Sequence, residues 1–182
     1  MTNYLIGIAG RSCSGKTEII KACMRVYPEA MHINQDLFFK QEADHWERPE
    51  SVRFDLLEHV LVDVKQGRTA LLPSTGWTEI CDRLVTPAPL VFVEGFLLYT
   101  QPRITALFEK KIYLNVSNKN LLQRRLQRNG EREHGYIQRK VIPDSLLYER
   151  MQRQAADVVI DANRNLSVVT QYVLGYLDGI LR

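Results

Sequence analysis

Residues Gly10 to Thr17 form a glycine-bounded pattern that is typical of phosphate binding. They spell G-x-x-x-x-G-K-T, with an apolar run before them and a helical pattern after them. The glycines let the backbone curl so that its N–H groups point at phosphate oxygens, and the helix adds the positive end of its dipole. In such a loop Lys16 neutralises the β- and γ-phosphates, and the Thr17 hydroxyl holds Mg²⁺. The pattern predicts binding of a nucleoside triphosphate, but it does not say what receives the phosphate.

Two acidic residues follow other apolar runs. Asp36 comes at the end of the second run, and Glu94 follows the four apolar residues of "LVFVEG". Beside a bound triphosphate, Asp36 could accept the proton of an attacking hydroxyl or help to hold Mg²⁺. Glu94 suits the second acidic partner of a phosphate-binding loop, and Gly95 after it allows close backbone approach. The alternative for both acids is a capping carboxylate, and their place at strand ends favours function.

Three arginines lie close together in "LLQRRLQRNGER". Arg124 and Arg128 share one face of the predicted helix, and Arg125 lies next to them. The guanidinium group binds phosphate in a bidentate manner and is always charged. A solvated basic helix face is an equal alternative. The polar segment that follows favours a lid over the phosphates, spanning approximately residues 124–140, which would exclude water.

The elements that must position these residues alternate along the chain. Short apolar runs predict buried strands, and apolar residues at helical spacing predict helices between them. This alternation predicts an α/β fold with an open, mostly parallel sheet, in which ligands bind at the carboxyl ends of the strands. The predicted strands are 4–9, 30–33, 69–73, 90–93, 111–116 and 158–161. The predicted helices begin at Lys16 and directly after a capping Ser51 (apolar face Val52, Leu56, Val60 and Val64), then span 118–129, 143–156 and 166–181, and "GWTEICDR" is predicted to be irregular.

Length and composition limit the function classes. The chain has 182 residues, 45% hydrophobic and 25% charged, which favours one domain over residues 1–182. A net charge of +3, with no basic stripe interleaved with aromatics, argues against nucleic acid as a partner. No apolar run is long enough for a membrane span, so no membrane partner is expected. Three cysteines without paired spacing favour a reducing, cytoplasmic setting. A monomer or small homo-oligomer is expected.

Several of these stretches occur together in one known group of enzymes. "GIAGRSCSGKT", "NQDLFFK", "FDLLEH", "VFVEGFLLY" and "LLQRRLQR" have the order and spacing seen in the uridine kinase-like P-loop nucleoside kinases. Within that group the chain most resembles the nicotinamide riboside kinases, over nearly its whole length. The resemblance implies a P-loop fold with a five-stranded parallel core sheet, flanking helices and a helical lid. It also implies ATP and Mg²⁺ as donor and cofactor, and the 5′-hydroxyl of a small-molecule riboside as acceptor.

The resemblance also implies roles for individual residues. Lys16 and Asp36 would be catalytic, with Asp36 accepting the proton of the 5′-hydroxyl. Asp55, otherwise a plain surface carboxylate, would bind the ribose hydroxyls, and Phe54 would lie against the base. Metal contacts would come from Thr17, Asp36 and Glu94. ATP contacts would come from Gly10, Arg11, Ser12, Cys13, Ser14, Gly15, Lys16, Thr17, Glu18, Arg124, Arg128, Asn163, Arg164 and Asn165, and substrate contacts from Asp36, Phe39, Phe54, Asp55 and Arg125.

The chain departs from the family pattern in three places. Leu37 replaces an acidic or small polar residue, and the Tyr- and His-containing stretch of uridine kinases is missing from residues 71–83. The lid tyrosine of nicotinamide riboside kinases is replaced by Asn129 or Gly130, and Tyr136 could substitute for it from a different place. A nicotinamide riboside kinase is therefore the leading interpretation. A kinase of uridine, cytidine or another small hydroxylated acceptor is the nearest alternative. A nucleotide-binding regulator or slow ATPase is the alternative from another class.

Overall fold

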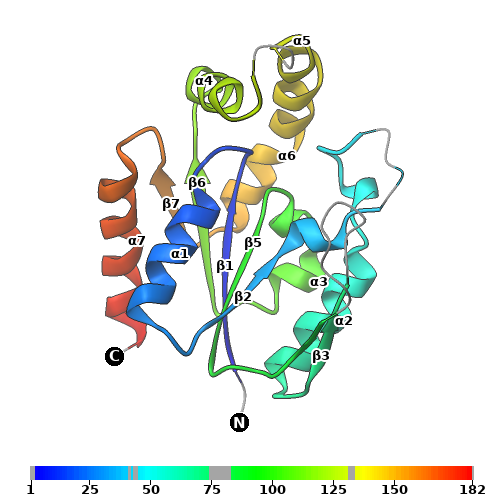
Figure 1. The fold of residues 1–182 in the computed structure, drawn as a ribbon, viewed down its shortest axis with the longest axis vertical. Coiled ribbons are helices and arrows are strands. Elements are labelled where there is room, and N and C mark those ends of the chain that lie inside the picture. The colour runs from blue at the N-terminus through cyan, green and yellow to red at the C-terminus, as the bar shows by residue number, and fades with distance from the viewer. Residues whose placement is uncertain (1–2, 41, 43–44, 74–82, 131–133, 182) are drawn as a thin grey trace.

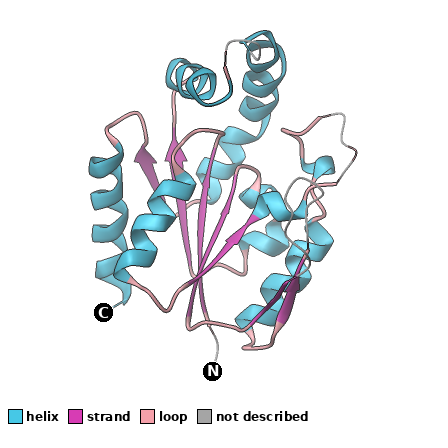
Figure 2. Ribbon diagram, viewed as in Figure 1, coloured by secondary structure: helices cyan, strands magenta, loops and turns pink. Residues whose placement is uncertain are grey.

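A computed structural model describes the chain except residues 1–2, 41, 43–44, 74–82, 131–133 and 182. Its centre is a five-stranded parallel sheet with the strand order β2-β5-β1-β6-β7. Helices cover both faces of this sheet (Figures 1 and 2). The α/β fold class with a five-stranded parallel core sheet is therefore confirmed. The strands are β1 (Tyr4–Gly10), β2 (Met31–Asn34), β5 (Leu90–Gly95), β6 (Lys110–Asn115) and β7 (Val158–Asp161).

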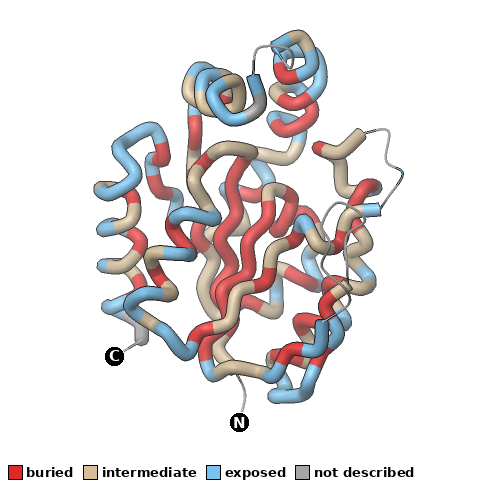
Figure 3. Tube along the Cα trace, viewed as in Figure 1, coloured by how far each residue is buried: buried red, intermediate tan, exposed pale blue. Residues whose placement is uncertain are grey.

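The buried strands send alternate side chains to the two faces of the sheet. On β1, Ile6 and Ile8 join one hydrophobic cluster, and Leu5 and Ala9 join the other. The first cluster packs against α1 (Lys16–Val26) and α7 (Leu166–Leu181), and the second packs mainly against α2 (Phe54–Lys65). Figure 3 shows the resulting band of buried residues along the strands. Two covered faces explain why these strands are continuous apolar runs in the sequence.

The helical segments at the carboxyl ends of the strands form the upper part of the molecule in Figure 1. They are α4 (Asn118–Asn129), and a continuous arm of α5 (His134–Tyr136), a π-helical segment (Ile137–Val141) and α6 (Ile142–Ala155). The sequence predicted α4 with these bounds. The arm begins before Pro143, where the sequence placed the start of its helix. Pro143 lies near the start of α6, directly after the π-helical segment.

Helix α2 begins later than the sequence predicted. It starts at Phe54, and Arg53 instead of Ser51 is at the capping position. Ser51 ends a short helical turn, Pro49–Ser51, and its hydroxyl donates to the backbone oxygen of His45. The buried residues of α2 are Leu57, Val60, Leu61 and Val64, whereas Val52 precedes the helix and Leu56 is only partly buried. The predicted apolar face was therefore wrong in its first half.

The remaining elements are short. β3 (Ala70–Leu72) lies within the predicted strand 69–73, and it pairs antiparallel with β4 (Arg83–Val85) in a separate two-stranded sheet. Most of the stretch "GWTEICDR", predicted to be irregular, lies outside the described residues; Arg83, its last residue, begins β4. α3 (Pro102–Thr105) contributes the buried side chain of Ile104 to the second cluster. In the described part of the chain, no helix is long and apolar enough to cross a membrane.

Candidate active site

The loop between β1 and α1 has the conformation that its glycines predict. Gly10 and Gly15 have φ angles of 155° and 95°, and Cys13 has a φ of 60°. A Cβ atom on Gly10 would lie 2.6 Å from the backbone oxygen of Leu114, so a larger residue would not fit there. Lys16 Nζ donates to the backbone oxygens of Gly10 and Arg11 at 2.8 and 3.2 Å. The loop is therefore a concave ring of backbone groups closed by a lysine.

Not every side chain of the loop faces the phosphate position. Arg11 is 3% exposed, and its Nε atom donates to Ser145 Oγ of α6 at 2.9 Å. Its Nη1 atom lies 3.5 Å from Glu149 of the same helix. The Arg11 side chain therefore ties the loop to α6, and only its backbone is left to serve the phosphates. Ser14 Oγ is buried without a hydrogen-bond partner among the described residues, and it suits an incoming acceptor.

Thr17 and Glu94 meet at the start of α1. Thr17 Oγ1 donates to the Glu94 carboxylate, with its oxygens at 2.9 and 3.0 Å, and His32 Nε2 lies 3.0 Å from Glu94 Oε1. Glu94 is 2% exposed. The sequence placed it at the end of a strand, and in the structure it is the last residue but one of β5. Burial opposes ionisation of Glu94, but hydrogen bonds from His32 and Thr17 and the charge of Lys16 outweigh it and lower its pKa. Glu94 is therefore an ionised acid next to the loop.

Asp36 lies at the carboxyl end of β2, next to the strand that carries Glu94. Its backbone N–H donates to Asn34 Oδ1 at 2.8 Å, which fixes the short helical turn Gln35–Phe38. Asp36 is exposed at the surface, but the protein around it displaces much of the water near its carboxylate. Desolvation is the largest cause of a raised Asp36 pKa; the charge of Lys16 opposes it, Glu94 reinforces it, and Arg128 opposes it more weakly. A carboxylate with a raised pKa is suited to accept a proton.

These acids can take part in Mg²⁺ binding together with bound phosphates. In the described chain, no cluster of three or more His, Cys, Asp or Glu side chains could hold a metal by itself. Mg²⁺ commonly uses one or two protein ligands, with phosphate oxygens and water completing its octahedron. The Thr17 hydroxyl, supported by ionised Glu94, fits that pattern, and Asp36 supplies a further oxygen at the rim. The residues therefore fit the cation that the sequence predicts.

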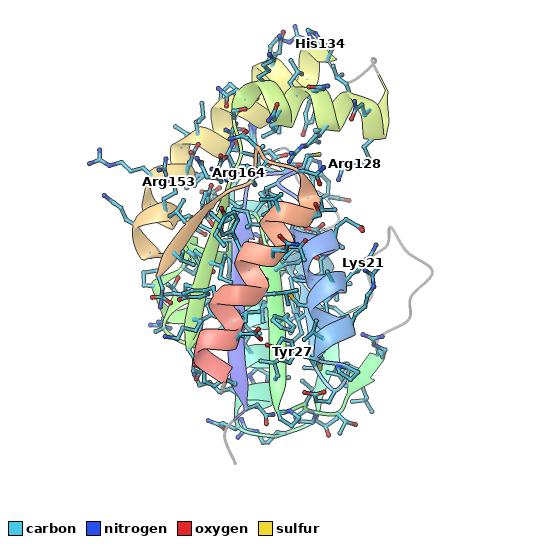
Figure 4. The ribbon with its side chains drawn as sticks, turned by 90° about the vertical axis from the view of Figure 1, so that its left-hand side faces the viewer. Lys21, Tyr27, Arg128, His134, Arg153 and Arg164 are labelled. Atoms are coloured by element: carbon cyan, nitrogen blue, oxygen red, sulfur yellow. The ribbon has the colours of Figure 1, made fainter. Side chains whose placement is uncertain are left out.

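Helix α4 reaches back onto the loop through two of its arginines. Arg124 Nη1 donates to the Cys13 backbone oxygen at 3.2 Å, and Arg125 Nη1 donates to Ser12 Oγ at 3.2 Å. Arg125 also lies 5.8 Å from the centre of the Tyr136 ring, which forms a cation–π contact with the helical arm. Figure 4 places Arg128 and Arg164 at the same end of the molecule, near α4. Of the three arginines predicted for a lid, Arg124 and Arg125 therefore contact the loop, and the charge of Arg128 acts on Asp36.

A cavity of about 220 Å³ lies beside the loop on the α7 side. Arg124 and Arg164 line it together with loop residues and the apolar residues Ala162, Leu166 and Val169. Of the three predicted residues after β7, Asn163 and Asn165 have supporting roles. The Asn163 side chain accepts from Ser117 N at 2.8 Å, and the Asn165 side chain accepts from Ser167 N at the start of α7. A larger hollow of about 600 Å³, between α6 and β7, does not include the loop.

The segment before α2 contains a pair that the sequence analysis did not single out, Trp46 and Glu47. Glu47 is 4% exposed; its Oε1 atom accepts from Arg125 at 3.0 Å, and its Oε2 atom has no hydrogen-bond partner among the described residues. Desolvation raises the pKa of Glu47, and Arg125 opposes that shift. The ring centres of Trp46 and Phe39 are 5.5 Å apart. The Phe39 ring also stacks on that of Phe96, with 5.6 Å between their centres. A buried carboxylate with one unpaired oxygen thus follows directly after a tryptophan that belongs to an aromatic cluster.

Phe54 and Asp55, which the sequence placed at the substrate, are the first two residues of α2. Phe54 packs against the hydrophobic cluster of that face, and Asp55 is exposed. Among the described residues, no hydrogen bond or ion pair joins Asp55 to the residues around the loop. Because α2 begins at Phe54, Asp55 lies on its solvent side. The signal for the alternative pair was present in the sequence as an aromatic residue followed by an acid in "HWERPE", eight residues earlier.

Gly95 follows Glu94 directly, and its lack of a side chain leaves room for Gln35. A Cβ atom there would lie 2.8 Å from Gln35 Cβ and would overlap the Gln35 side chain, whose Oε1 atom accepts from Leu97 N. Gln35 precedes Asp36 directly. We expect Gly95→Ala to lower the free energy of unfolding by about 1–3 kcal/mol through overpacking, as measured by urea denaturation. Gly175→Ala, in open space on α7, is the control and should not destabilise; an unchanged Gly95→Ala variant would contradict the packing.

Comparison with known proteins agrees with this geometry. The model of the "Phosphoribulokinase / Uridine kinase family" matches residues 24–168. A uridine kinase of Borreliella burgdorferi (strain ZS7) is 30% identical over 138 residues, which cover 69% of this chain and 66% of that protein. The chain thus matches just under two thirds of that relative's length. A uridine kinase of Shewanella frigidimarina is 25% identical over 203 aligned positions, covering 97% of this chain and 96% of the relative.

Solved structures show the same fold. A "possible uridine kinase" from Bacillus stearothermophilus has a TM-score of 0.64 at 19% identity, covering 88% of this chain and 90% of that chain. Phosphoribulokinase from Rhodobacter spheroides has a TM-score of 0.63 at 17% identity, covering 88% of this chain and 70% of that chain. At these identities the likeness concerns the fold, which is that of P-loop kinases. The family model, which matches most of the chain, shows that the protein belongs to the phosphoribulokinase/uridine kinase family.

Proposed function

We propose that the protein is a kinase that uses ATP and Mg²⁺ to phosphorylate the 5′-hydroxyl of a riboside, with nicotinamide riboside as the leading substrate. The observation that carries this proposal is the arrangement of Lys16, Thr17, Glu94 and Asp36 around one loop at the carboxyl ends of β1, β5 and β2. Such an arrangement supplies both a phosphate-binding loop and a proton acceptor. Family membership supports a nucleoside kinase as the general class.

In the proposed reaction each residue has a simple task. The backbone of Gly10 to Lys16 and the Lys16 ammonium bind the β- and γ-phosphates, and Mg²⁺, when bound, neutralises charge on their oxygens. Asp36 orients the acceptor hydroxyl and takes its proton as the oxygen attacks. Arg124, Arg125 and Arg128 of α4 spread the charge of the transferred group and exclude water. The cavity lined by Arg124 and Arg164 receives the adenine.

Two features support a riboside with a flat ring. Glu47 is buried with one free carboxylate oxygen, which suits a hydrogen bond from a ribose hydroxyl. The rings of Trp46 and Phe39 offer an aromatic surface nearby. A nicotinamide riboside carries a positively charged pyridinium ring, and aromatic faces attract such cations. We therefore assign ribose binding to Glu47 in place of Asp55, and base stacking to Trp46 and Phe39 in place of Phe54.

Uridine is the second candidate, because both curated relatives described above are uridine kinases. Most of the segment in which uridine kinases carry their Tyr- and His-containing stretch, residues 74–82, lies outside the described residues. The test is a panel of ribosides (nicotinamide riboside, uridine, cytidine and adenosine) with ATP and Mg²⁺, measured as ADP release. We expect the highest kcat/KM for nicotinamide riboside.

The other results of this panel are equally informative. Strong activity on uridine with none on nicotinamide riboside would overturn the choice of base and leave the kinase assignment in place. If no riboside stimulated ATP consumption or raised the melting temperature, the protein would be a nucleotide-binding regulator or slow ATPase instead. Lys16→Ala serves as the control for contaminating kinases, because it removes the phosphate-binding ammonium.

A further inference from the structure

His32 lies on the same side of the sheet as Glu94 and α1. In the parallel pairing of β2 with β5, His32 is opposite Phe92 and Asn34 is opposite Glu94, so His32 is the diagonal neighbour of Glu94. Phe92 belongs to the cluster that packs against α1, whereas Ile33, the next residue of β2, belongs to the opposite cluster. Strand alternation therefore directs His32 toward the start of α1, where Thr17 lies.

The three side chains form one chain of hydrogen bonds. His32 Nε2 is 3.0 Å from Glu94 Oε1, and the Thr17 hydroxyl is 2.9 Å from Oε1 and 3.0 Å from Oε2. An ionised carboxylate only accepts hydrogen bonds, so His32 must donate through Nε2–H. His32 is three-quarters buried, with 24% of its side chain exposed, and Glu94 is 2% exposed. Water therefore competes little for this carboxylate.

The donation from His32 limits how Glu94 can be oriented. Thr17 has one hydroxyl proton, and that proton is used on Glu94. The lone pairs of Thr17 Oγ1 are then left for a cation at the loop. Without this second donor, the carboxylate could rotate or withdraw from Thr17, and the hydroxyl proton could then turn toward the cation position. A buried acid that loses one of two partners is also left partly unsatisfied.

We propose that His32 is a positioning residue of the nucleotide site. It holds Glu94 so that Glu94 accepts the hydrogen bond of the Thr17 hydroxyl. The Thr17 oxygen then faces the cation that accompanies the bound phosphates. This inference rests on the proposed function, because it assumes a nucleotide with Mg²⁺ at the loop. His32 itself touches neither nucleotide nor acceptor in this arrangement. Its effect is expected on the dependence on Mg²⁺ more than on the binding of the acceptor.

The test compares His32→Leu with His32→Gln, His59→Leu and the wild type. Leucine removes the donor, whereas the glutamine Nε2 amide lies the same number of bonds from Cβ and can donate in its place. His59, exposed on α2 with Asp63 as its neighbour, is the matched control. The first readout is the melting temperature with ADP, with and without Mg²⁺. The second is the Mg²⁺ concentration that gives half-maximal ADP release at saturating riboside.

We expect His32→Leu to lose most of the extra thermal stabilisation that Mg²⁺ adds to ADP. We also expect about a 10- to 100-fold increase in its half-maximal Mg²⁺ concentration, the usual effect of losing a partner that orients a metal ligand. His32→Gln should restore both, and His59→Leu should match the wild type. If His32→Leu melted earlier but kept the wild-type Mg²⁺ dependence, His32 would be purely structural and the inference wrong.

The two proposals can fail separately. A wild-type protein that phosphorylates a riboside, with a His32→Leu variant of unchanged Mg²⁺ dependence, would overturn only the role of His32. A wild-type protein whose melting temperature with ADP does not respond to Mg²⁺ would overturn the donor site, and both proposals with it. A wild type that shows the Mg²⁺ response but phosphorylates no riboside would remove the kinase proposal while the melting experiment still tests His32.

Discussion

Asp36→Asn is expected to remove most of the turnover while leaving ADP binding nearly unchanged. Asparagine keeps the shape of the side chain but cannot accept the proton of the attacking hydroxyl. A positioned general base typically contributes about 10²- to 10⁴-fold, so kcat should fall by that amount. Lys16 and Thr17, the proposed ligands of the phosphates and of Mg²⁺, stay in place. The measurement is steady-state ADP release with the preferred riboside, together with calorimetric titration of ADP and Mg²⁺.

The same substitution should stabilise the folded protein at neutral pH. The pKa of Asp36 is raised, chiefly by desolvation, so the folded state holds the proton more tightly than the unfolded state does. Ionised Asp36 therefore disfavours folding: this cost is absent below the unfolded pKa and is complete once the pH has risen through the folded pKa. The wild type should melt at a lower temperature than Asp36→Asn at pH 7, and this difference should shrink as the pH falls toward 4.

Two outcomes would contradict this assignment. Unchanged kcat in Asp36→Asn would mean that Asp36 is not the proton acceptor. Loss of ADP binding together with kcat would mean that Asp36 belongs to the donor site instead. Glu29→Gln is the control, since Glu29 is an exposed acid between α1 and β2, at the edge of the sheet opposite the loop. It should keep turnover close to that of the wild type.

Glu47→Gln should lower kcat/KM for the riboside by about 10- to 100-fold, mainly through KM. Hydrogen bonds to a charged group contribute about 1.5–3 kcal/mol, and glutamine replaces the carboxylate with a neutral amide. Its oxygen can still accept from Arg125, which keeps the contact between this segment and α4. The lost charge should therefore affect the acceptor more than the fold. The KM for ATP, measured at saturating riboside, should change little.

Asp55→Asn is the matched comparison, because it makes the same chemical change at the residue that the sequence alone favoured. Asp55 is exposed in the first turn of α2, and its neutralisation should leave the riboside KM unchanged. The reverse result, a large effect at Asp55 and none at Glu47, would restore the sequence-based assignment. It would also mean that this part of the acceptor site rearranges when the riboside binds.

The sequence by itself determined the glycine-bounded loop between β1 and α1 and the strands around it. Gly10 to Thr17 is a contiguous motif, and its backbone conformation depends on glycines and on the helix that follows directly. The buried strands were predictable because each has both faces covered, which requires continuous apolar runs. Asp36 and Glu94 could be found because acids at the ends of parallel strands must meet at one edge of the sheet.

The tertiary structure decided the contacts between distant segments. Arg11 points to α6 and not to the phosphate position, and His32 reaches Glu94 only because β2 pairs with β5 in this register. Glu47 contacts Arg125 from the segment before α2, and α2 itself begins two residues later than its apolar pattern indicated. These outcomes depend on strand order, helix start and packing across the sheet. Local side-chain patterns carry little information about such long-range contacts, because several arrangements bury the same apolar residues equally well.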